Sequence, residues 1–433
     1  MSNRRKQLMI GAGAAALAVA LIVALVIWRS AGNGPDGGQI AGPDSTPPAT
    51  ADSADTTTPT TVKPYTKDPP VAEPPAPIIR DPLTWPFAGT SIWNTPLGAS
   101  AQLVPASMSL GRGGVTADEN ILIFEPGAPP VDVLFHEGAW DANKIRCQEV
   151  TSQRLAGGWP VPPDFVTDPG YLGATPNHAA AVLLADGDTL VQTQPLHRCS
   201  AGGPLISQYL FEQDSLRNGN GIAGAHGGSR MSSVGGTIRL GELVPGGALH
   251  HALKLNIDCQ AFCSYDQSDP DGKAGFRWPA GAADGEAPTR YQGKVPQLQM
   301  GALLALPATF DVAALQTEPA RMVARAMQRY GAYVVDDTHY PSFALTTEWS
   351  PDGRVVDEFQ AAWGFPMQIG VDPADCPDGG AACAWTQDLA LMIAALTVVD
   401  DNSAAAIGGA GTRLSTCAPP YADGSGAGPC PSS

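Results

Sequence analysis

Apolar and polar residues alternate along several short segments between residues 179 and 349, and glycine, proline or aspartate residues bound each segment. Alternation with a period of two is typical of half-buried β-strands, and these bounding residues favour turns. The pattern therefore predicts strands within residues 179–186, 188–196, 235–243, 249–257, 332–337 and 343–349.

Two segments show a helical period instead. In residues 317–331, Thr317 and Pro319 suit the start of a helix, apolar residues recur every three or four positions, and Gly331 suits its end. Residues 385–400 also carry an apolar stripe at helical spacing. Many short strands with two or so short helices indicate a mainly β fold. We expect a jelly-roll-like β-sandwich, with a propeller as the alternative although no repeat is visible.

The N-terminus carries a different pattern. Residues 8–28 form an uninterrupted apolar run of 21 residues, which is long enough to span a bilayer and follows basic residues at positions 4–6. By the positive-inside tendency, residues 1–30 form a cytoplasmic basic tip and a transmembrane signal anchor, with the main domain extracellular. A cleaved signal peptide is the alternative. The expected localisation is the cell membrane, as a single-pass protein.

A linker and one large domain follow. Residues 31–80 contain 11 prolines and 8 threonines and few large aliphatic residues, so we expect a disordered, extended linker. Residues 81–433 are long enough for a sizeable core and form the expected extracellular β-rich domain. All eight cysteines lie there, which outside the cytoplasm indicates disulfides. Short spacings favour the pairs Cys259–Cys263, Cys376–Cys383 and Cys417–Cys430, which leaves Cys147–Cys199.

Charge and motifs exclude several classes of function. The formal net charge of -17 disfavours a nucleic-acid partner. GNGIAG at 219–224 lacks the strand before it and the helix after it that a dinucleotide site needs, so we expect no cofactor. FHEGAW at 135–140 lacks the second histidine of a zinc protease motif, and DQSDPDGKAG at 266–275 lacks the closing glutamate of a calcium loop. We therefore expect no metal.

The glycine-rich stretch AGAHGGSRMSSVGGTIRLGEL at 223–243 is the most unusual part of the sequence. Its glycines permit tight bends and close backbone approach before the predicted strand. On that strand Arg239 lies on one face, and Glu242 lies with apolar neighbours on the other. Glu242 is either a solvated residue at the strand end or a partly buried carboxyl suited to proton transfer. His226, at the bend, either stabilises the turn or acts in function.

Other polar residues fall on predicted strand faces. In 249–257, alternation places His250 and Lys254 on the polar face of the predicted strand and His251 on the core face. His250 and Lys254 either line a binding groove or are simply solvated. Gln192 and Gln194 share a face, where amides suit sugar hydroxyls as well as ordinary sheet pairing.

Carboxylates also follow an apolar strand near residue 335. Asp336 and Asp337 end one predicted strand, and Glu348 lies in the next. Glycoside cleavage needs two carboxyl groups about 5 to 10 Å apart, so these residues are candidates for its acid and base. Capping of a turn by either aspartate is the alternative.

Several strings resemble a known family. GIAGAHGGSRMSSVGGTIRLGELVPGG, YGAYVVDDT and the opening WPFAGTSIWNTPL are similar to a family of secreted bacterial proteins with no assigned activity, over most of residues 84–420. The stretch GGAGTRLSTCAPPY departs from that family's pattern. The resemblance implies a secreted, carbohydrate-associated setting and transfers no catalytic residue.

These observations predict an extracellular glycoside hydrolase acting on a polysaccharide or oligosaccharide. Its catalytic carboxyl groups would come from Glu242, Asp336, Asp337 and Glu348, and its stacking aromatics would be Trp93, Trp349 and Trp363. In a polysaccharide lyase, the first alternative, His226 or His250 would remove a proton while Arg239 or Gln192 neutralises a uronate. The second alternative is a glycan-binding surface module without chemistry, and the third is an envelope scaffold that binds no sugar.

Overall fold

The computed structural model describes residues 80–139, 147, 150–167, 178–267, 274–369 and 380–426. The predicted anchor at 1–30 and nearly all of the linker at 31–80 lie outside these residues. Arg80, which we placed at the end of the linker, is buried and forms a β-bridge with Tyr421. No helix in the described part of the chain is long and apolar enough to cross a membrane.

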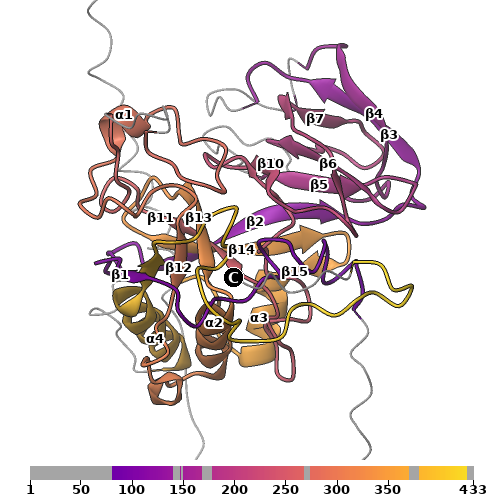
Figure 1. Cartoon of the computed structure of the whole chain (residues 1–433). Coiled ribbons are helices and arrows are strands. Elements are labelled where there is room, and N and C mark those ends of the chain that lie inside the picture. Colours follow the sequence, from indigo (N-terminus) through magenta and orange to yellow (C-terminus); the bar gives the residue numbers. More distant parts are fainter. Residues whose placement is uncertain are drawn as a thin grey trace, which may run out of the picture. The chain divides into compact units, whose positions relative to one another are not determined.

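Most strands belong to one large mixed sheet, in which the strand order is β1-β16-β12-β13-β11-β14-β2-β5-β6-β8, with β15 beside β14 and β9 beside β6 (Figure 1). Their bounds are β1 Leu103–Pro105, β2 Val115–Ile123, β5 Ala180–Leu183, β6 Thr189–Gln194, β8 Tyr209–Leu210, β9 Asp214–Ser215, β11 Leu253–Ile257, β12 Leu303–Ala305, β13 Ala332–Asp337, β14 Phe343–Ser350, β15 Gly353–Arg354 and β16 Thr397–Val399.

A second sheet of three strands has the order β4-β3-β7, built from β3 Pro130–Phe135, β4 Arg154–Pro160 and β7 Leu205–Ser207. It packs on one face of the large sheet near β5 (Figure 1). Alternate residues of β2 show the two faces, because Ile121 and Ile123 join the apolar core under the small sheet while Leu122 joins the main core on the other face. This packing is consistent with a β-sandwich.

The helices are α1 Ala287–Arg290, η2 Val312–Ala314, α2 Glu318–Arg329, α3 Val355–Trp363 and α4 Ala381–Ala395. Helices α2 and α4 pack together, and α2 covers β12 (Figure 1). The mainly β class is thus confirmed. The observed sheet differs from the expected jelly roll, in which neighbouring strands are antiparallel. Three pairs of neighbouring strands are parallel here: β11 with β13, β14 with β2, and β2 with β5.

Most of the predicted elements are confirmed. The predicted strands at 179–186, 188–196, 332–337 and 343–349 correspond to β5, β6, β13 and β14, and the helix expected in 317–331 is α2. Of 249–257, only the part from Leu253 onward is a strand. The second predicted helix begins earlier, at Ala381, and ends at Ala395, before β16. The pattern gave no sign of α3.

The strand predicted at 235–243 is wrong. These residues form turns, and only Ile238 makes a β-bridge, to Thr347. Gly236 and Gly241 adopt φ values of 73° and 82°, in the left-handed region that interrupts an extended strand. The apolar alternation of the segment therefore reflects burial without strand pairing.

Two of the predicted disulfides are present, Cys147–Cys199 and Cys259–Cys263. Cys383 and Cys417 are also disulfide-bonded. Cys376 and Cys430, the partners expected for them, lie outside the described residues.

Candidate functional site

The glycine-rich segment 223–243 lies across one face of the large sheet and is held there by polar side chains of the strands. Gln192 of β6 accepts a hydrogen bond from the Ser233 N–H at 2.7 Å and donates to the Ala223 carbonyl at 3.1 Å. Lys254 of β11 is fully buried, and its Nζ donates to the Ser232 carbonyl at 2.7 Å. Strand side chains that were predicted to face a groove therefore position this segment.

His226 ends the short strand β10 Ala223–His226 within this segment, and its side chain is 1% exposed. Its Nε2 lies 3.3 Å from Oδ2 of Asp118 and 3.4 Å from Oδ1 of Asn256. Its Nδ1 lies 3.1 Å from the side-chain amide of Asn120. Burial, and then the charge of Lys254, hold the pKa of His226 well below its usual value. The ring is therefore neutral, with its proton on Nε2, where two oxygens accept, and with Nδ1 accepting from Asn120.

Asp118 lies on β2 beside this ring, and its side chain is 14% exposed. Its Oδ2 also accepts a hydrogen bond from Nδ2 of Asn256 at 3.0 Å. Burial raises the pKa of Asp118 above its usual value, while the hydrogen bond from Asn256 and the charge of Lys254 oppose the rise. Burial thus favours the neutral form of this carboxyl, whereas Asn256 and Lys254 favour its ionised form.

Asp336 brings a second carboxyl to the same place, from the end of β13. Its Oδ1 accepts hydrogen bonds from the backbone N–H groups of Gly228 and Asp337, each at 3.0 Å. Burial, and then the neighbouring charges of Asp284 and Asp118, raise the pKa of Asp336 well above its usual value. Asp336 is therefore a candidate proton donor.

The bend at residues 227 and 228 requires glycine. Gly227 has a φ of 42°, and a Cβ atom there would lie 2.0 Å from the carboxyl of Asp336. A Cβ atom on Gly228 would lie 2.3 Å from a carboxyl oxygen of Asp284. The two glycines thus let the backbone lie directly against two carboxyl groups.

Asp284 is the third carboxyl of the cluster. Its Oδ2 accepts a hydrogen bond from the hydroxyl of Tyr291 at 2.6 Å, and burial raises the pKa of Asp284. In the described ranges, no group of three or more histidine, cysteine, aspartate or glutamate residues is arranged to hold a metal ion. We call Asp118, His226, Asp284 and Asp336 the bend cluster.

Other predicted residues form a second cluster, around Arg239. Nε of Arg239 lies 2.6 Å from Oε2 of Glu348, and both side chains are more than nine-tenths buried. Glu242 accepts a hydrogen bond from the Arg239 N–H at 2.7 Å and lies 3.1 Å from Nε2 of His251. Burial opposes the charged form of His251, but Glu242 and the hydrogen bonds to the ring outweigh it and raise the pKa of His251.

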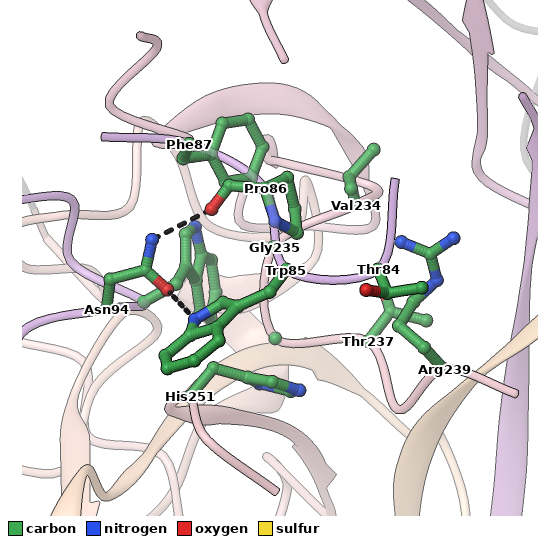
Figure 2. A pocket seen from close by; sticks show the side chains of 12 residues that line it. Thr84, Trp85, Pro86, Phe87, Asn94, Val234, Gly235, Thr237, Arg239 and His251 are labelled. Carbon is green, nitrogen blue, oxygen red and sulfur yellow. Dashed lines mark hydrogen bonds between the residues drawn. The ribbon is translucent and has the colours of Figure 1, made fainter. Parts of the chain in front are cut away.

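A narrow pocket of about 10 Å³, the volume for about one water, lies beside the Arg239 cluster. Figure 2 shows Arg239 and His251 there, with Thr84 near Arg239 and Trp85 near His251. Arg239 and Glu348 thus bind the glycine-rich segment to β14 in a site too small for a sugar. The structure does not bring Glu242 or Glu348 into the bend cluster.

Trp93 is buried, and Trp349 is half-buried among other side chains. Trp93 is 1% exposed, and its ring packs against Gly235 and Gly236, so its predicted contact with a sugar is not supported. Trp349 lies between other rings, 5.1 Å from His178, with the guanidinium of Arg354 5.2 Å from its ring.

Trp363 and His250 are half-buried. Nε1 of Trp363 donates to the Leu243 carbonyl at 2.8 Å. The ring of His250 stacks on Trp85 at 5.0 Å. Among the described residues, no contact joins Trp363 or His250 to a member of the bend cluster.

The surroundings of Gln194 and Asp337 indicate structural roles. Gln194 is buried on β6. Asp337 forms an ion pair with Arg290 and accepts the backbone N–H of Cys259 at 3.0 Å, so it anchors loops at the end of β13.

Sequence reasoning missed Asp118 and Asp284, together with the amides Asn120 and Asn256. The segment 115–123 was not predicted as a strand, because VTADENILI places four polar residues between its apolar ends. Polar residues inside an otherwise apolar run were the one signal available for Asp118 and Asn120. Nothing in the sequence around Asp284 marks it.

Comparison of the chain with protein-family models, with curated proteins and with solved structures finds no match. The resemblance to secreted bacterial proteins therefore remains a prediction, and the chemistry of the bend cluster is the evidence on which a function is proposed.

Proposed function

We propose that this protein is a membrane-anchored extracellular glycoside hydrolase that acts on a polysaccharide, and that the bend cluster is its active site. The observation that carries the proposal is a buried carboxyl with a raised pKa, Asp336, in electrostatic contact with a second carboxyl, Asp118. Glycoside hydrolysis requires two such groups, one protonated and one ionised.

The surroundings of the two carboxyl groups favour different roles. Asp336 is more deeply buried, at 6% exposure, and has the stronger upward shift of its pKa, so it suits the general acid that protonates the leaving oxygen of the glycosidic bond. Asp118 receives hydrogen bonds from Asn256 and from the neutral His226, both of which favour its ionised form. It suits the carboxylate that activates water or attacks the anomeric carbon.

The exposed edge of Asp118 gives the direction of approach. Its side chain is 14% exposed, and we infer that a glycan reaches the carboxyl groups from the side of this exposed part. His226 and Asn256 position Asp118 in this scheme. The neutral glycan class is favoured because a protein of net charge -17 repels a polyanion.

The test is turnover of a panel of neutral cell-wall polysaccharides, measured as new reducing ends. Asp336→Asn and Asp118→Asn should each lower kcat by about 10²-fold to 10⁴-fold, because a positioned acid or base contributes that much. Asp357→Asn is the matched control, since the side chain of Asp357 is 70% exposed on α3. It should leave turnover unchanged.

Other outcomes separate the alternative functions. Products that absorb in the ultraviolet would contain a new double bond, which points to a lyase. Glycan that is retained without new reducing ends would indicate a binding module. Full turnover by both Asn variants would contradict the assignment of the active site.

A further inference from the structure

A second candidate ligand site lies where the described chain begins. A cavity of about 350 Å³ is lined by residues 80–82 and 421–423 together with Arg217. This volume is within the range of sites for small molecules and accommodates one monosaccharide. No residue of the bend cluster lines it.

The unusual group in this cavity wall is Arg80, which is 2% exposed. Its guanidinium lies 3.9 Å from the ring centre of Tyr421, and its Nη2 donates to the Gly426 carbonyl at 2.9 Å. Its Nε and Nη1 have no hydrogen-bond partner among the described residues. A buried cation with unused N–H groups is costly, so its retention indicates a partner beyond the described residues, and the cavity offers room for one.

Another buried arginine shows how a buried guanidinium usually pairs its N–H groups. Arg198 is 1% exposed and, like Arg80, forms no ion pair with another described residue. Its guanidinium instead donates to the carbonyls of Gly203, Pro162 and Phe165. Arg80 has a single carbonyl acceptor in place of these three. Burial lowers the pKa of Arg80, and the phenol of Tyr421, whose own pKa is raised to about 12, is uncharged near neutral pH.

A second cation lies on the same aromatic ring. The guanidinium carbon of Arg217 is 5.6 Å from the ring centre of Tyr421, and its side chain is 35% exposed. Nη1 of Arg217 pairs with Asp423 at 3.1 Å. Two guanidinium groups thus flank Tyr421 at one cavity, and one of them lacks an anion.

We propose that this cavity binds the carboxylate of a small acidic sugar, a hexuronate, through Arg80 and Arg217. The planar guanidinium presents pairs of N–H groups that match the two oxygens of a carboxylate. The sugar ring then occupies the rest of the cavity. Binding here is independent of the hydrolase proposal, because it needs neither turnover nor the bend cluster. Asp81 and Asp423 also line the cavity, so the attraction for a carboxylate comes from the unpaired N–H groups of Arg80 and not from a net positive charge of the lining.

The test is isothermal titration of the full chain at low ionic strength with galacturonate, with glucose and with inorganic phosphate. Galacturonate should bind and the neutral sugar should not. Arg217→Gln should weaken galacturonate binding at least about tenfold, because a charge-assisted contact is lost. Arg154→Gln is the matched control, since its side chain is 60% exposed and lies on the small sheet, and it should bind as the parent does.

Arg80→Met provides the second variant. It keeps an unbranched apolar stem against Tyr421 and removes a buried cation, so it should fold and bind no galacturonate. Arg217→Gln decides the proposal even if Arg80→Met unfolds. Equal binding of glucose and galacturonate, or unchanged binding by Arg217→Gln, would overturn it. Tighter binding of phosphate than of galacturonate would overturn the assignment to a carboxylate.

Discussion

The carboxyl of Asp336 accepts a hydrogen bond from the backbone N–H of Gly228 at 3.0 Å, which holds the end of β13 against the glycine bend. Because the bend has no side chains at residues 227 and 228, its backbone covers the carboxyl and removes it from water. Burial raises the pKa of Asp336, whereas the hydrogen bond from Gly228 itself favours the ionised carboxylate and opposes this rise.

Gly227→Ala should destabilise the protein strongly. The added Cβ atom would lie 2.0 Å from the Asp336 carboxyl, and the residue would keep a φ of 42°, so we expect a loss of about 3 kcal/mol or more in the free energy of unfolding. Gly241→Ala is the matched control, because Gly241 also has a positive φ, 82°, but nothing lies within 4 Å of its added Cβ. It should lose only the backbone strain, about 1 kcal/mol. Equal losses in urea unfolding would contradict the close approach.

Asp336→Asn should change stability with a defined pH dependence. Because the pKa of Asp336 is raised in the folded state, the stability that its protonation contributes is fully present below the unfolded value of about 3.8 and is lost as the pH rises through the folded pKa. Asparagine is neutral throughout and keeps an oxygen to accept from Gly228. The variant should therefore be more stable than the parent near pH 7, and this advantage should disappear toward pH 4.

Urea unfolding of both proteins from pH 4 to pH 8 measures that difference. Taking the difference cancels the opposite contribution of His226, whose lowered pKa costs stability as the pH falls below its unfolded value of 6.5. A difference that stays constant across this range would show that Asp336 does not titrate with a raised pKa.

A double-mutant cycle should measure a strong coupling energy between Arg239 and Glu348. Arg239→Met or Glu348→Gln alone leaves one buried charge unpaired and should cost about 3–5 kcal/mol. The double variant should cost less than the sum, by about 1–3 kcal/mol. The exposed pair of Arg154 and Asp132, with side chains 60% and 55% exposed, is the control and should couple by about 1 kcal/mol or less. Additive losses at the buried pair would show that the two residues act separately.

The two described disulfides should differ in their effect on stability. Cys147–Cys199 closes a sequence separation of 52 and Cys259–Cys263 a separation of 4. Chain entropy then predicts losses of about 4 and about 2 kcal/mol when each pair is replaced by serine. Thermal unfolding of the two double-serine variants measures this. A larger loss for the short loop would contradict the entropic account.

The sequence by itself determined the local elements whose signals are contained within a few residues. Helix α2 follows from Thr317, Pro319 and the apolar spacing up to Gly331, and strands β13 and β14 follow from their apolar runs. The pairing of Cys259 with Cys263 follows from their short separation. Each of these rests on short-range geometry, which the order of residues fixes directly.

Tertiary structure decided which contacts the polar residues make. The alternation in 235–243 predicts a strand, but its backbone pairs with β14 at Ile238 alone. Arg239 and Leu240 are instead bound to the side chain of Glu348 on β14. Likewise Lys254 and Gln192 lie on the predicted strand face, yet that face is covered by the glycine-rich segment and not by solvent.

The bend cluster shows the same division. His226 and Asp336 were candidates from their positions beside glycines and at a strand end, whereas Asp118 and Asp284 join them only because β2 and the loop before α1 meet the bend in space. A pKa depends on burial and on charges from every part of the chain that surrounds the group. The sequence therefore determined which residues could carry chemistry, and only the packing of distant segments decided which of them share one environment.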